Sequence, residues 1–128
     1  MSDPMSPPMT CTRLYCDDNG DSHFQDFEID LNSVQYAPPA PALDISASMP
    51  ASSAFWFRFP KGWSDDAHPS PRRQLFIVLT GRVEGWTSLG DRRVFGPGDR
   101  LLMEDTSGPG HGARPIDGEA TALVVALD

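Results

Sequence analysis

Two histidines and a glutamine are the first candidates for chemistry in this sequence. His68 lies in a proline-rich stretch, and His111 follows a glycine turn. Gln74 opens an apolar run, and because side chains alternate along a strand, it points to the same side as Phe76. A buried glutamine needs hydrogen-bond partners, which a metal ion or a ligand would supply. A hydrogen-bond network with Ser70 and the histidines would serve equally, so the residues alone leave both interpretations open.

Charged residues flank these three positions. Arg72 offers a guanidinium fork that suits a ligand carboxylate or phosphate, although it and Arg73 are as well explained by salt bridges with acids such as Asp65. Either Glu104 or Asp105 would supply a general base if its side chain faced a pocket. Neighbouring strand residues point to opposite sides, so at most one of the two acids faces inward. The solvated interpretation is favoured for both.

Short apolar runs separated by glycines predict antiparallel β-structure from Phe55 onward. The predicted strands are residues 55–59, 74–80, 83–87, 92–95, 100–104, 111–116 and 121–127. Turns are expected between them, including turns at Gly81 and Gly118, because glycine suits positions with positive φ. Seven short strands with tight turns are typical of a sandwich or barrel, and no segment is periodic enough to predict a helix.

The first part of the chain has a different composition. Residues 1–54 hold eight acidic residues, one basic residue and seven of the 13 prolines. Alternation over residues 23–31 predicts a short edge strand, and the prolines of residues 36–41 predict an extended connector that wraps over the core. We therefore expect an acidic, proline-rich extended segment with one or two edge strands over residues 1–54. The barrel is expected over residues 55–128.

Two spaced patterns in this second part resemble the signatures of the cupin superfamily. The first signature, Gly-x5-His-x-His-x3-Glu-x6-Gly, is matched in every interval by Gly62, His68, Ser70, Gln74 and Gly81. The second signature ends in a Gly-Asp turn followed by a histidine, and the matching residues here are Gly98, Asp99 and His111. The run His-Pro-Ser-Pro-Arg-Arg-Gln over residues 68–74 is similar to that of small single-domain bacterial cupins. The resemblance covers about residues 55–127 and implies an all-β, double-stranded β-helix (jelly-roll) barrel with an extended N-terminal segment.

The resemblance also implies a metal site. In a metal-binding cupin, three imidazoles and a carboxylate converge on one divalent ion and leave positions open for substrate. In this chain the corresponding ligands are His68, Gln74 and His111, with Ser70 in place of one histidine. The loss of the carboxylate weakens the site and disfavours Mg²⁺ and Ca²⁺. Zn²⁺, Ni²⁺ or Fe²⁺ fits such a set, and a barrel without metal is equally consistent with it.

Three functions follow from this resemblance and stay open. The first is a metal-assisted lyase, isomerase or cyclase acting on a small organic acid or carbonyl compound. The second is a metal-free barrel that binds a small molecule without catalysis, and the third is a structural module that dimerises through an outer sheet face. The residues expected to contact a ligand are Ser70, Arg72 and Phe76, and those expected on the outer face are Leu75, Ile77 and Leu79.

Charge and hydropathy exclude other classes of function. The net charge of −8 and the pI of about 4.6 argue against nucleic-acid binding. The longest apolar stretch, residues 122–127, is far shorter than the ~20 residues of a membrane span. The first ten residues have neither the basic nor the apolar region of a secretory signal, so a cytoplasmic protein is expected. The resemblance implies a homodimer, because cupins often pair through outer sheet faces. Cys11 and Cys16 are expected to be ordinary thiols, and the role of His23 is not predicted.

Overall fold

Nine β-strands and no helix are found in residues 7–128, the part of the chain that the computed structural model describes. The strands are β1 (Thr10–Cys16), β2 (Ser22–Glu28), β3 (Asn32–Val34), β4 (Leu43–Ile45), β5 (Ala51–Phe59), β6 (Gln74–Thr87), β7 (Arg92–Phe95), β8 (Arg100–Met103) and β9 (His111–Leu127). The all-β prediction is confirmed. The first six residues, which belong to the predicted acidic segment, lie outside the described part.

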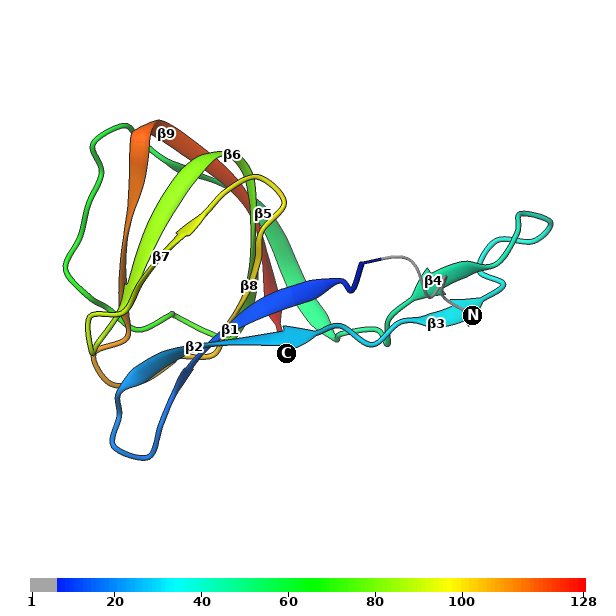
Figure 1. The fold of residues 1–128 in the computed structure, drawn as a ribbon, viewed down its shortest axis with the longest axis horizontal. Coiled ribbons are helices and arrows are strands. Elements are labelled where there is room, and N and C mark those ends of the chain that lie inside the picture. Colours follow the sequence, from blue (N-terminus) through cyan, green and yellow to red (C-terminus); the bar gives the residue numbers. More distant parts are fainter. Residues whose placement is uncertain (1–6) are drawn as a thin grey trace.

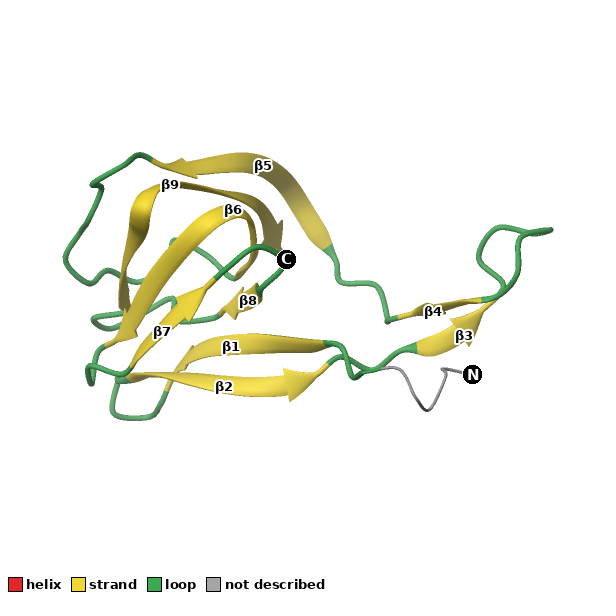
Figure 2. Ribbon diagram, turned by 45° about the horizontal axis from the view of Figure 1, so that its top comes forward, coloured by secondary structure: helices red, strands yellow, loops and turns green. Residues whose placement is uncertain are grey.

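The long antiparallel pair β6 and β9 forms the centre of a seven-stranded sheet. The other edge of β6 pairs first with β8 and then with β7, and the other edge of β9 pairs with β5. The sheet curls so that the inner faces of its strands surround one interior (Figures 1 and 2). Because side chains alternate, Phe76, Val78 and Val124 point into this interior, where they join the buried core.

Two predicted turns are bends within longer strands. The pairing of β6 with β9 shifts from Thr80 opposite Thr121 to Arg82 opposite Ile116, so the sheet continues past Gly81. Gly81 has φ +75°, and a Cβ at this position would lie 2.5 Å from the carbonyl oxygen of Glu119. Glycine is therefore required here by a close approach of two strands within a bulge, which single-sequence turn signals do not separate from a true turn. As a result, four predicted strands merge into β6 and β9.

The N-terminal segment contributes to the same sheet as the barrel strands. β2 is an edge strand, as the alternation predicts, but β1 lies inside the sheet between β2 and β8. The pairing of β1 with β8 is parallel, with Thr12 opposite Leu101, and this makes the sheet mixed. The expected boundary after Ala54 falls inside β5.

The prediction of a connector that wraps over the core is wrong. Residues 35–42 join β3 to β4 in a separate two-stranded sheet that projects away from the barrel (Figures 1 and 2). The amide of Ala40 donates to the carbonyl of Ala37 at 2.9 Å, so the chain turns back on itself within the proline-rich stretch. We call this hairpin, residues 32–45, the β3–β4 arm.

Glu104, directly after β8, binds two arginines from other parts of the sheet. Its carboxylate accepts hydrogen bonds from Arg13 of β1 at 2.5 Å and from Arg73, next to β6, at 2.7 Å. Burial alone would raise the pKa of Glu104, but the hydrogen bonds from both arginines outweigh burial and lower this pKa. The cluster therefore stabilises the position of β1 against β6 and β8 at neutral pH.

We predict that Glu104→Gln lowers the free energy of unfolding by about 1 kcal/mol at pH 7, because both ion pairs lose their anion while solvent screens the exposed arginines. The lowered pKa of Glu104 gives stability that is present above the ordinary carboxyl pKa of 4.5 and is lost as the pH falls through the folded-state pKa. The difference between wild type and variant should therefore vanish in acid. Urea unfolding at a series of pH values measures it.

Glu119→Gln is the matched control, since Glu119 pairs with Arg58 at 3.5 Å and both side chains are more than half exposed. This variant should stay within about 0.5 kcal/mol of wild type at every pH. A loss for Glu104→Gln that persisted unchanged in acid would contradict the ionic origin of the effect.

Candidate functional site

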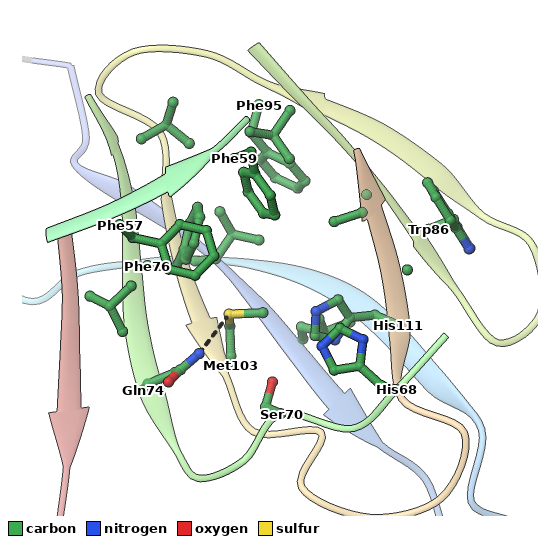
Figure 3. A pocket seen from close by; sticks show the side chains of 18 of the residues that line it. Phe57, Phe59, His68, Ser70, Gln74, Phe76, Trp86, Phe95, Met103 and His111 are labelled. Carbon is green, nitrogen blue, oxygen red and sulfur yellow. Dashed lines mark hydrogen bonds between the residues drawn. The ribbon is translucent and has the colours of Figure 1, made fainter. Parts of the chain in front are cut away.

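The barrel interior contains a cavity of about 310 Å³. Most of its wall is apolar and comes from the inner faces of the strands, with aromatic rings packed edge to face, such as Phe57 against Phe76. Two polar patches interrupt this wall, one at the pair His68 and His111 and the other at Gln74 (Figure 3). Such a cavity suits an apolar molecule with few polar groups.

Backbone pairing places the two histidines side by side. His68, in the segment before β6, and His111, the first residue of β9, exchange both backbone hydrogen bonds at 2.9 and 3.0 Å. Their ring centroids lie 5.1 Å apart. Gly110 is required next to this bridge, because it has φ +68° and a Cβ there would lie 2.1 Å from the carbonyl oxygen of His68. The prediction that the two histidines share one pocket agrees with this geometry.

A fully buried carboxylate orients His111. Asp105 Oδ2 lies 2.5 Å from His111 Nδ1, and Asp105 Oδ1 accepts a hydrogen bond from the hydroxyl of Ser70 at 2.7 Å. The backbone amide of Ser70 also donates to the carbonyl of Asp105. A carboxylate on Nδ1 holds the proton there and leaves Nε2 as the nitrogen with the free lone pair. Ser70 therefore holds the carboxylate that in turn orients His111.

His68 has a carboxylate partner of its own. Its Nδ1 contacts Asp65 Oδ2, and Asp65 Oδ1 lies 3.4 Å from the backbone amide of Ala113 on β9. The side chain of His68 is 46% exposed, whereas that of His111 is 9% exposed. The cavity thus has two Asp–His pairs, one at the solvent side and one inside.

The favoured interpretation of Asp105 as a solvated acid is wrong, because its side chain is fully buried. The alternation rule was correct that the two neighbouring acids point apart, since Glu104 faces the arginines. Sequence reasoning gave Asp65 no role at the site. It stands three residues before His68, but that segment is a loop, and loops have no periodicity from which a contact follows.

The other predicted contact residues lie in different places. Phe76 and Gln74 line the cavity, and the amide of Gln74 donates to Met103 Sδ at 3.6 Å. Figure 3 shows Met103 between Gln74 and the histidines. Arg72 lies outside the cavity lining, where its guanidinium donates to the hydroxyl of Ser52 at 2.8 Å.

The large aromatic residues of the barrel form two groups. Trp63, Trp86 and Phe76 line the cavity, and Trp86 packs so closely that a Cβ on Gly112 would lie 2.1 Å from its indole. Trp56 of β5 points the other way and is 79% exposed. The pocket wall therefore combines aromatic with aliphatic side chains.

The set His68, Gln74 and His111 does not fit a catalytic metal site. Such a zinc site has three protein ligands, and within residues 7–128 no group of three or more His, Cys, Asp and Glu side chains is arranged to hold an ion. The carboxylates of Asp65 and Asp105 already contact imidazole Nδ1 atoms. In Figure 3, Met103 lies between Gln74 and the two histidines, so the two imidazoles remain as the neighbouring ligands for an ion.

The solved structures similar to this chain include the following two. A cupin 2 conserved barrel domain protein from Salinispora arenicola is 20% identical with a TM-score of 0.47, over 90% of this chain and 81% of that one. A protein from Salmonella typhimurium, described as ethanolamine utilization protein Q, is 11% identical with a TM-score of 0.41, over 95% and 98% of the two chains. The first description names the family that the sequence resembles.

No protein-family model matches the chain, and no curated protein matches it either. Residues 7–128 include no helix of the length and hydropathy that a membrane crossing requires.

Proposed function

We propose that this protein binds a small, mainly apolar organic molecule in the barrel and transfers protons to and from its polar group through the two Asp–His pairs. One observation carries the proposal: two adjacent imidazoles, each with a carboxylate on Nδ1, stand in the wall of a mainly apolar cavity. The cavity volume of about 310 Å³ lies at the lower end of the range of ligand pockets, so the ligand is small.

The two pairs have the properties that general acid–base catalysis needs. A carboxylate behind an imidazole fixes the ring and stabilises the cation that forms when Nε2 takes a proton. A neutral imidazole accepts a proton from the substrate while a protonated one donates to it, and the apolar surroundings strengthen both interactions. Isomerisation or elimination on a small carbonyl compound needs such a pair and no further reactant.

A weakened metal site at His68, Gln74 and His111 is the other route to the same reactions. We predict that wild-type protein, purified without tag or chelator, retains no stoichiometric Zn, Ni or Fe after dialysis, because two imidazoles are too few ligands. The variant Gln74→Glu should not raise the affinity for Zn²⁺, since Met103 separates this position from the histidines. Elemental analysis measures both. Equimolar metal that disappears in His111→Ala would contradict the prediction.

For ligand binding, we predict that 4-nitrophenol, an aromatic ring with a hydroxyl group and a nitro group, binds wild-type protein in equilibrium dialysis. His68→Ala should weaken this binding by about tenfold, the value of one hydrogen bond to the ligand. His23→Ala is the matched control, because His23 also pairs with an aspartate, Asp17, but lies outside the cavity lining. Equal binding by wild type and His68→Ala would show that the histidines do not contact the ligand.

For proton transfer, we predict that wild-type protein accelerates exchange of the α-hydrogens of cyclohexanone with deuterium oxide, followed by NMR. Asp105→Asn should reduce the rate at least about tenfold, since the amide keeps the shape of Asp105 but no longer stabilises the imidazolium. Asp17→Asn, at the pair remote from the cavity, should leave the rate unchanged. Tight 4-nitrophenol binding without exchange would favour the non-catalytic binding barrel.

A further inference from the structure

The β3–β4 arm stands apart from the other strands of the described residues. Within residues 7–128, β3 and β4 pair with each other and with no other strand. Val34 and Leu43 stand opposite each other on this hairpin and are 39% and 51% exposed, and Tyr36 at its tip is 70% exposed. A two-stranded hairpin is marginally stable alone in water. Its apolar side chains therefore need a surface that the same barrel does not offer.

The outer face of the main sheet is apolar across three strands. Trp56 of β5 stands opposite Leu123 of β9, which stands opposite Ile77 of β6, and the next row holds Val125 and Leu75. These side chains point away from the cavity, because their neighbours in the strands line it. Strands with apolar residues on both sides are typical of sheets covered on both faces. Trp56, at 79% exposure, lacks such a cover.

Charge also favours contact between the arm and this face. The arm, residues 32–45, carries one charged residue, Asp44, and the acidic Asp30 lies just before it. Arg58, two residues after Trp56 on β5, pairs with Glu119 at 3.5 Å. The exposed Arg72 donates to the hydroxyl of Ser52 at the start of β5 and pairs with no carboxylate within residues 7–128. An acidic hairpin with apolar side chains therefore complements an apolar face with a basic edge.

We infer that the β3–β4 arm of one copy packs on the outer face of β5, β6 and β9 of a second copy, and that the second copy returns the contact. The arm points away from its own barrel, so only another molecule brings such a face to it (Figures 1 and 2). One chain supplies both halves of the interface. In a dimer with two-fold symmetry, this contact occurs twice, so both arms and both faces are covered.

Sedimentation velocity over a concentration series tests this dimer. Wild type should sediment as a dimer, and Trp56→Lys and Leu43→Lys should each raise the dimer dissociation constant at least about tenfold, as loss of a central interface residue does. Leu89→Lys is the control, since Leu89 is 60% exposed in the turn after β6 and lies outside both surfaces. All three positions are exposed, and circular dichroism verifies that each variant folds.

Mixing the two defective variants separates arm exchange from simple pairing of faces. A mixed dimer of Leu43→Lys and Trp56→Lys has one intact contact, between the arm of the Trp56→Lys chain and the face of the Leu43→Lys chain. The mixture should therefore dimerise more strongly than either variant alone. A monomeric wild type, a dimer unaffected by Leu43→Lys, or a mixture no stronger than its components would each overturn the inference.

Discussion

The buried carboxylate of Asp105 is the interaction on which the candidate site depends. It follows β8, yet it binds the imidazole at the start of β9 and the hydroxyl of Ser70 in the segment before β6. A buried carboxylate without partners would be strongly destabilising, so the three segments are held in one arrangement by the need to satisfy it. The backbone bridge between His68 and His111 adds a second connection at the same point. The polar wall of the cavity is therefore rigid.

The contrast between this polar wall and the rest of the cavity is the basis of the proposed proton transfer. Phenylalanine and tryptophan side chains line much of the cavity, and an imidazole with a carboxylate partner retains its orientation in such surroundings. The inner pair, Asp105 and His111, is shielded from solvent, whereas His68 is half exposed at the other side of the bridge. Under the proposed function, the two similar pairs offer the ligand one imidazole inside the cavity and one near solvent.

The composition of the two parts of the chain has a structural counterpart. The acidic, proline-rich first part supplies β1 and β2 to the main sheet and then leaves it as the β3–β4 arm (Figure 1). Proline has no amide to donate, which is why the stretch around residues 36–41 forms a hairpin loop rather than a sheet strand. The chain then returns at β5, whose inner side lines the cavity and whose outer side shows Trp56.

The sequence by itself predicted strands from residue 55 onward, because alternation and glycine placement act locally: β5, β7 and β8 lie within a few residues of their predicted ranges. It also predicted that His68 and His111 meet. Only the tertiary structure decided that Gly81 sits in a bulge, that the arm leaves the barrel, and that Asp65 and Asp105 face the histidines. These features depend on the approach of segments far apart in the chain or on loop conformation, and neither leaves a periodic signal in the residues themselves.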